Sequence, residues 1–277
     1  MVVKLAEIEV IFYIEGIGND KKVLERALEE TAKKLKNESR VKVEYVKVEE
    51  VIEDPNSETL PYSGMIEAKL KGSLREIAIL AITYAPAVVE VVGPGKLEIE
   101  GNELMKILGE VSYMMGQLMD KFGALAAYPK LDEFPEPKIG YAREEIEEMV
   151  VEDRMLLYRF VVEVFGNDEE EVKRGFAKAL SYEGCKINKL VTKIQGEKNE
   201  RKYILVAAEL LSTFETMFQL TAKYAPVAIS VIEPEVVDIT ASELQGALAD
   251  LAGFVYELVT RPVKKEIVEK ETFKFKL

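Results

Sequence analysis

The side chains of this chain that could do chemistry are carboxylates, amines, phenols, hydroxyls and one thiol, because the sequence contains no histidine. Without histidine, neither a Ser-His-Asp triad nor a histidine-ligated zinc site can form. Cys185 is the single cysteine, so an intramolecular disulfide is excluded as well. Any site must therefore be built from Asp, Glu, Lys, Arg, Tyr, Ser, Thr and Cys185.

Two similar segments, TYAPAVVEVVGP from Thr83 and KYAPVAISVIEP from Lys223, each place a tyrosine at the end of an apolar helix. Because the residue before a proline is pushed out of the helical region, these helices should end near Tyr84 and Tyr224. A phenol there can line a cleft between the halves, or it can anchor the turn by hydrogen bonding to a carbonyl. We favour the anchor and keep both tyrosines as candidate ligand-binding residues.

The same two segments end in proline loops at equivalent positions, Gly93-Pro94-Gly95 and Glu233-Pro234-Glu235. If the halves pack about a pseudo-two-fold axis, these loops flank one groove, and clefts between domains are common ligand sites. The predicted groove is asymmetric, since one loop carries glycine where the other carries glutamate. The candidate ligand-binding residues are Tyr84, Tyr224, Gly93, Gly95, Glu233 and Glu235.

Two further motifs favour structural roles. The segment GIGND from Gly16 lies between a strand and a helix, but it lacks the GxGxxG spacing, and Asp20 would repel a phosphate, so we interpret it as a tight turn. Cys185 lies near the start of a predicted strand, with Lys186 pointing to the opposite face. We expect a small buried filler there, because a nucleophilic thiol needs a base or a positive neighbour.

Acidic clusters indicate solvated surface more than metal sites. Oxygen clusters suit Mg²⁺ or Ca²⁺, but no EF-hand spacing is present. We interpret the first cluster as a solvated loop and the second as the outer face of a linker helix, and we predict no metal and no cofactor. The clusters are Glu49, Glu50, Glu53, Asp54 and Glu58, and Glu144, Glu145, Glu147 and Glu148.

An internal repeat organises the chain. When Leu70–Met119 is aligned with Leu210–Val259, twelve of 50 positions are identical, against about three expected from composition. The segments GNDKKVLERAL from Gly18 and GNDEEEVKRGF from Gly166 pair at a different offset, because the loop between the blocks differs in length. The chain is therefore expected to hold two copies of one unit.

Each copy reads as strand, helix, strand, strand, helix, strand and one further helix. Alternating apolar residues predict the first strand, and Asn19 and Asn167 are expected to cap the helix that follows. Methionines on the further helix of the first copy suggest core packing or an oligomer contact. Capping boxes are predicted at Ser73 with Glu76, Ser212 with Glu215, and Thr240 with Glu243.

This order predicts an α+β protein, a tandem duplication of a ferredoxin-like βαββαβ unit with an extra C-terminal helix in each copy. A single sheet shared by both copies is the alternative. In the last segment, Phe273, Phe275 and Leu277 alternate with lysines, which often guard an edge strand. The expected boundaries are 1–125 for the first repeat, 126–153 for a linker with a short helix, 154–262 for the second repeat and 263–277 for an edge strand.

The composition limits the cellular location and the classes of binding partner that we expect for this chain. The net charge of −13 would repel nucleic acid and anionic membranes. The longest stretch without charge, residues 77–89, is too short to span a bilayer and contains Pro86. Abundant Glu and Lys with few Asn and Gln are typical of thermophile proteins. We predict a cytoplasmic protein that binds neither nucleic acid nor membrane.

Two functions from different classes fit these observations. The first is a non-enzymatic module that binds a small ligand or a protein partner. A homo-oligomer built through the third helices is a further, structural interpretation. The alternative is a carboxylate- or Mg²⁺-dependent enzyme with its site in a groove between the repeats. A buried cluster of Asp and Glu with Lys or Arg would favour the enzyme.

Overall fold

The computed structural model describes residues 7–57, 59–125, 131–198 and 201–274 of the 277-residue chain. The protein is mixed α+β, with antiparallel sheets and α-helices. Its contacts divide the chain into two compact units, each built from separate segments of the sequence. Unit 1 comprises Met1–Leu97, Lys121–Gly123 and Thr240–Leu277, and unit 2 comprises Glu98–Asp120 and Ala124–Ile239.

In unit 1, helices pack on one face of an antiparallel sheet whose strand order is β2-β4-β1-β5, with β3 also paired to β4. Ile8, Val10 and Phe12 alternate along β1 and are fully buried on that face, as the period of the sequence predicts. The elements are β1 (Glu7–Gly18), α1 (Lys21–Lys36), β2 (Lys42–Val48), β3 (Ile52–Glu53), β4 (Tyr62–Ser73), α2 (Leu74–Tyr84), β5 (Val88–Gly93) and α7 (Ala241–Lys274).

Unit 2 contains a four-stranded antiparallel sheet with the order β10-β7-β9-β8. Two short strands, β6 (Lys96–Glu100) and β11 (Val236–Thr240), form a separate two-stranded sheet. The remaining elements are α3 (Gly101–Phe122), η1 (Leu131–Glu133), α4 (Arg143–Val151), β7 (Leu156–Gly166), α5 (Glu169–Tyr182), β8 (Lys186–Lys198), β9 (Arg201–Ser212), α6 (Phe214–Tyr224) and β10 (Ala228–Glu233).

The two larger sheets have the same connectivity. When the four main strands of each are numbered along the chain, both sheets read 4-1-3-2 across. The central pairs are long and regular: β1 is in register with β4 over twelve residues and β7 with β9 over eleven. The single continuous sheet that was the alternative is not what the structure has.

Helix caps agree with the sequence in two cases and differ in others. Ser73 with Glu76, and Thr240 with Glu243, form the predicted capping boxes. In unit 2 the cap of α6 is Thr213, one residue after the predicted Ser212. The first helices are likewise capped by the aspartates that follow Asn19 and Asn167, because an ionised carboxylate is a strong acceptor for the free N–H groups of a first turn.

The repeated tyrosine segments end their helices as predicted. Helices α2 and α6 stop at Tyr84 and Tyr224, and the next residue, Ala85 or Ala225, takes a left-handed conformation with φ of 43°. In each case the alanine N–H donates to the helix carbonyl four residues earlier. This αL cap turns the chain from the helix into the following strand.

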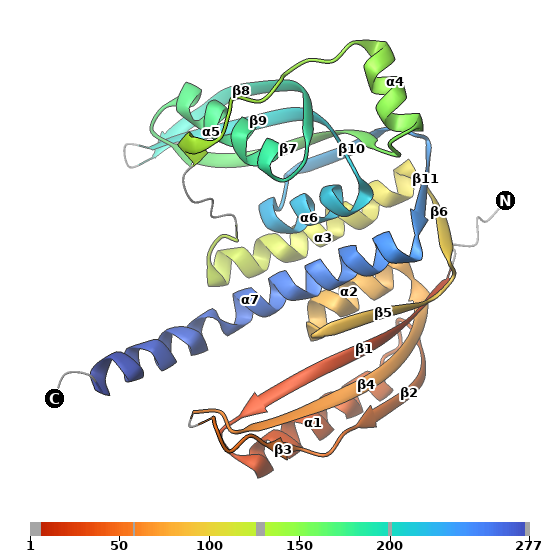
Figure 1. Ribbon diagram of the computed structural model, residues 1–277, viewed down its shortest axis with the longest axis vertical. Helices are drawn as coiled ribbons and strands as arrows, with labels where there is room; N and C mark the ends of the chain where they lie inside the picture. Colours follow the sequence, from red (N-terminus) through yellow and green to blue (C-terminus); the bar gives the residue numbers. More distant parts are fainter. Residues whose placement is uncertain (1–6, 58, 126–130, 199–200, 275–277) are drawn as a thin grey trace. The chain divides into compact units, whose positions relative to one another are not determined.

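Helices α3 and α7 each belong to a different unit from the larger sheet whose strands precede them in the same half of the sequence. Helix α7 packs against α2 and β5 in unit 1 (Figure 1), where Gln245 accepts a hydrogen bond from the Val91 N–H at 3.0 Å. Helix α3 belongs to unit 2, where the Ser112 hydroxyl donates to the Pro226 carbonyl at 2.6 Å. The units therefore differ from the expected boundaries of 1–125 and 154–262.

The structure corrects the prediction of a C-terminal edge strand over residues 263–277. Helix α7 runs to Lys274, and residues 275–277 lie outside the described part of the chain. The alternation of Phe273 with lysine is too short to outweigh the Lys- and Glu-rich stretch before it, which favours continuation of a helix already formed. Pro262 lies within this helix.

Candidate functional site

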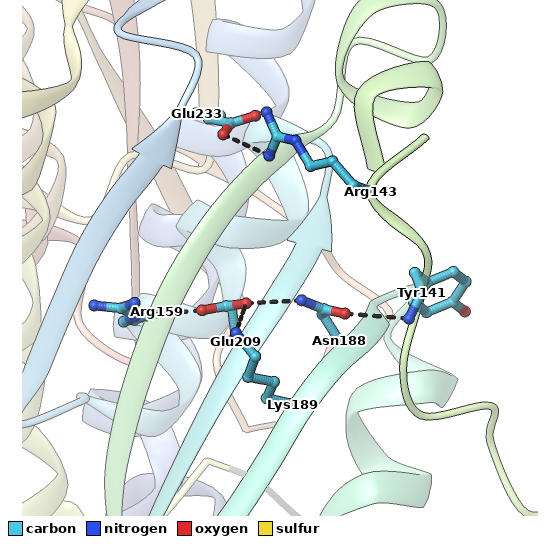
Figure 2. A network of polar contacts seen from close by, with 7 residues as sticks. All are labelled: Tyr141, Arg143, Arg159, Asn188, Lys189, Glu209 and Glu233. Atoms are coloured by element: carbon cyan, nitrogen blue, oxygen red, sulfur yellow. Dashed lines mark hydrogen bonds and ion pairs between the residues drawn. The ribbon is translucent and has the colours of Figure 1, made fainter. Parts of the chain in front are cut away.

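A polar cluster on the face of the unit 2 sheet that α4 partly covers is the candidate functional site (Figure 2). Three neighbouring strands each contribute one charged residue: Arg159 from β7, Glu209 from β9 and Lys189 from β8. The register places Arg159 directly opposite Glu209 on one side and Lys189 opposite it on the other. Because facing residues of adjacent strands lie about 5 Å apart, the two cations flank one carboxylate.

Glu209 is the buried centre of the cluster. Its side chain is 9% exposed, and its carboxylate accepts hydrogen bonds from Arg159 Nε at 3.3 Å and from Lys189 Nζ at 2.8 Å. Asn188 Nδ2 donates a third bond at 2.7 Å. Burial alone would raise the pKa of Glu209, but the hydrogen bonds from Lys189, Asn188 and Arg159 outweigh it and lower the pKa.

The two cations remain in solvent while Glu209 holds them. The side chains of Arg159 and Lys189 are 66% and 68% exposed. Among the described residues, the hydrogen bond of Arg159 to Glu209 uses Nε and neither of the outer guanidinium nitrogens. The cluster therefore carries one net positive charge and presents donors at fixed positions, an arrangement that suits an incoming anionic group.

The segment before α4 is bonded to the same cluster. The Tyr141 N–H donates to Asn188 Oδ1 at 3.1 Å, so Asn188 bridges this segment and Glu209 (Figure 2). Helix α4 then packs Ile146 against Leu157 and Leu211 on the sheet. Part of the sheet face is thus covered by α4, and the charged cluster lies at the border of the covered area.

Glu233, one of the predicted ligand-binding residues, is held by α4. Its carboxylate lies 2.7 Å from Arg143 Nη1, and Arg143 Nε also contacts Glu147 at 2.8 Å. Next to this ion pair is a cavity of 280 Å³ whose lining includes Arg154, Pro234 and Asp238. The Arg154 guanidinium donates to the Asp238 carbonyl at 3.0 Å. Because Pro234 is among the lining residues, this cavity borders the predicted proline loop.

Tyr224 is a packing residue. Its ring meets the rings of Phe160 and Phe176 edge to face, with centroids 6.1 and 5.4 Å apart. The turn that follows it, and not the phenol itself, lines a second cavity of 390 Å³. That cavity is lined by Gly109, Ser112, Tyr113, Gly116, Gln117, Asp120, Ala225, Pro226 and Val227.

Tyr84 lies near the charged pair Glu38 and Arg40 in unit 1. Burial raises the pKa of Tyr84, and the Glu38 carboxylate adds to the increase. The guanidinium of Arg40 donates two hydrogen bonds to the Glu38 carboxylate, from Nη2 at 2.7 Å and from Nε at 2.9 Å. These hydrogen bonds lower the pKa of Glu38 to about 2 against the opposing effect of burial.

Replacing Arg40 with alanine is expected to return the pKa of Glu38 toward its ordinary value. A carboxylate with a lowered folded-state pKa stabilises the fold above its unfolded pKa, and this stabilisation is lost as the pH falls toward 2. The Arg40→Ala protein should therefore lose less stability between pH 5 and pH 2 than the parent. Carbon-detected NMR titration of Glu38 measures the pKa, and exposed Arg26→Ala is the control that should leave it unchanged.

The two proline loops fall in different units. Gly93 and Gly95 belong to unit 1 and have open space where a Cβ would lie, whereas Glu233 and Glu235 belong to unit 2. Both X-Pro peptide bonds, at Pro94 and at Pro234, are cis. The groove expected between the copies stays a prediction.

The interpretation of Cys185 as a buried filler is confirmed. The thiol is buried, 3.9 Å from the Tyr158 hydroxyl, which lies 3.0 Å from Ser212 Oγ. Burial raises the pKa of Cys185 to about 12, so the thiol stays protonated and unreactive at neutral pH.

In the described part of the chain, no three His, Cys, Asp or Glu side chains are arranged to hold a metal ion. In the first acidic cluster, Glu49 pairs with Lys47 and Asp54 accepts from the Asn56 N–H, while Glu58 lies outside the described residues. The described helices also include none that is long and apolar enough to cross a bilayer.

The sequence did not lead to the Glu209 cluster, although a signal was present. Glu209 interrupts the apolar run YILVAAELLS, and Arg159 interrupts LLYRFVV. A lone charge in an otherwise buried strand needs a partner. The partner could not be named, because Arg159 and Lys189 are 50 and 20 residues away and only the strand order brings them together.

Comparison with known proteins shows the family. The sequence model of the MJ0538 family matches residues 9–265, so the chain belongs to that family. It is similar to the "Uncharacterized protein MJ0538" of Methanocaldococcus jannaschii, with 29% identity over 246 residues that cover 87% of this chain and 93% of the relative. No solved structure matches the chain.

Proposed function

We propose that this member of the MJ0538 family is a non-enzymatic binding module that recognises an anionic group of a ligand or protein partner on the unit 2 sheet. The observation that carries the proposal is the buried Glu209 carboxylate, which fixes Arg159 and Lys189 while two thirds of each side chain stays in solvent. Preorganised donors bind an anion without the entropy cost of ordering two long side chains first.

The matching face of unit 1 supports the proposal by contrast. There Lys69 lies between Glu9 and Glu44, and Lys71 pairs with Glu7. The lysines on that face are thus each matched by carboxylates, which leaves little positive charge to attract an anion. In the Glu209 cluster of unit 2, one buried carboxylate pairs with two exposed cations.

The architecture is part of the same proposal. We infer that the chain arose by tandem duplication of a ferredoxin-like βαββαβ unit, supported by the shared 4-1-3-2 strand order and by the two tyrosine segments that end α2 and α6 alike. The copies have since diverged, with paired charges on one sheet and the Glu209 cluster on the other. A reduced, buried Cys185 supports a cytoplasmic location.

Anion binding is tested by isothermal calorimetry at low ionic strength with glutarate and with inorganic phosphate. We expect Arg159→Ala and Lys189→Ala each to weaken binding of at least one of these anions about 10-fold, the effect of losing one charge-assisted hydrogen bond. Lys69→Ala, a lysine of the unit 1 face, is the matched control and should bind as the parent does. Equal affinity of all four proteins, or no binding of either anion, would contradict the proposal.

A further inference from the structure

Strand β8 is one of the two edge strands of the four-stranded unit 2 sheet, and in the described part of the chain only the beginning of its free edge is paired. Ile139 forms a parallel bridge with Ile187, and the Gly140 N–H donates to the Ile187 carbonyl at 3.0 Å. The next N–H, of Tyr141, bonds the side chain of Asn188 instead, and the chain then turns into α4. An extended segment therefore already pairs with this edge and leaves it at Asn188.

Beyond Asn188, β8 pairs regularly with β9 over several residues. Register shifts interrupt the pairing of β8 with β9 at Ile187/Lys189 and at Ile194/Gly196, so residues 189–194 form a regular stretch between two bulges. Six residues are the length of an ordinary strand. In the described part of the chain, this stretch has β9 on one side and no strand on the other.

The side chains of the open stretch alternate in type. Lys189, Val191 and Lys193 share the sheet face that carries Arg159 and Glu209, since all pair with residues of that face on β9. Val191 is 61% exposed, and Ile194, which points to the other face at the end of the stretch, is 42% exposed. Lysine on an edge strand discourages indiscriminate pairing, but it does not account for exposed Val and Ile within the same stretch.

We propose that residues 189–194 of β8 bind an extended, acidic segment of a protein partner, which adds to the sheet as a further strand. The proposal rests on the anion recognition proposed above and names its partner. Main-chain hydrogen bonds supply affinity in this mode, and alternate side chains supply specificity. Carboxylates at positions i and i+4 of the segment lie opposite Lys189 and Lys193, and an apolar residue at i+2 lies beside Val191.

A protein segment fits this edge better than a nucleic acid does. A polyphosphate would meet the field of a chain with net charge −13 along its whole length, whereas the segment needs only two carboxylates. The linker shows in addition that the edge accepts a peptide backbone. Nucleic acid on the same face is the competing outcome, and the experiment includes it.

The test uses fluorescein-labelled peptides of the pattern Glu-Thr-Val-Thr-Glu, flanked by threonines, with the full-length protein and fluorescence anisotropy. The parent peptide should bind, and a Glu→Gln version should bind at least 10-fold more weakly. The protein variant Lys189→Ala with Lys193→Ala should show a similar loss, while Lys69→Ala should not. Both altered lysines are exposed, and thermal unfolding checks that the variant is folded.

Two peptides methylated on alternate backbone nitrogens test strand addition itself. A strand at an edge donates only every second N–H to the sheet, so one of the two methylated peptides should lose binding and the other should keep it. If both bind as the parent does, strand addition is wrong, although anion recognition stands. If no peptide of the pattern binds, the inference is wrong regardless of the calorimetry.

The proposal and its premise fail in different ways. Peptide binding that is unchanged by Arg159→Ala and by Lys189→Ala would contradict the proposed anion site, because these residues would then not contribute. A labelled single-stranded oligouridylate is the last arm. Binding of that RNA tighter than the peptide, with displacement of the peptide, would overturn the inference in favour of a nucleic-acid surface.

Discussion

A fragment of residues 1–125 is expected to lack the cooperative unfolding transition of the full chain. Unit 1 is completed by α7, which lies more than 110 residues beyond the end of this fragment. Leu244, Leu248 and Leu251 of α7 are 0 to 1% exposed. Truncating one buried leucine costs about 2–5 kcal/mol of stability. Losing three of them is therefore comparable to the whole free energy of unfolding of a typical domain, about 5–15 kcal/mol. Circular dichroism during thermal unfolding is the measurement.

Helix α3, which the fragment retains, is not expected to replace α7. It is the equivalent helix by the repeat, but it carries Met105 where α7 has Gln245, so it lacks the carbonyl that accepts the Val91 N–H. It also carries Ser112 where α7 has Ala252, and Ser112 is matched to the Pro226 carbonyl of unit 2. Each final helix is thus specialised for the unit in which it packs.

Co-expression with residues 131–277 is the control for the fragment experiment. The second fragment supplies α7, so the pair should co-purify and regain a cooperative transition with native-like helical content. A monomeric 1–125 fragment that unfolds cooperatively by itself would contradict the prediction. That result would mean that α3 can fill the position of α7, and that the exchange of helices is not required for stability.

Local features of this fold could be predicted from the sequence, because local features depend on neighbouring residues. Ser73 and Glu76 are three residues apart, so their capping box follows from spacing, and the helix end at Tyr84 follows from the proline two residues later. The helix exchange could not be predicted. The sequence alignment pairs α3 with α7, but it does not decide which sheet each helix covers.

Two further features escape prediction for other reasons. The short strand β6 does not stand out in the sequence, although Leu97 and Ile99 are buried in alternation with glutamates, because five residues give too little periodicity to separate a strand from a turn. The repeated segments direct attention to Tyr84, Tyr224 and the two proline loops, and ligand binding at those residues stays a prediction. The Glu209 cluster lies where the two copies differ, and a search for shared residues leads away from it.

Replacement of Glu209 by lysine is expected to destabilise the protein by about 3–5 kcal/mol, the cost of leaving a buried charge without its partner. The substitution removes the acceptor for three hydrogen bonds and places an ammonium between Arg159 and Lys189. Glu209→Gln keeps one carbonyl acceptor and should cost less, about 1–2 kcal/mol. Urea denaturation at neutral pH gives both values.

Glu163→Lys is the matched control, because Glu163 lies on the same face of the same sheet but is exposed. The charge change is identical, so a similar loss in both variants would show that net charge, and not burial, sets the effect. Combining Arg159→Glu with Glu209→Lys should recover part of the loss, since facing residues of one network do not act additively. Recovery would show that residues 159 and 209 interact directly. The proposed anion recognition requires this interaction, because Glu209 holds Arg159 in position.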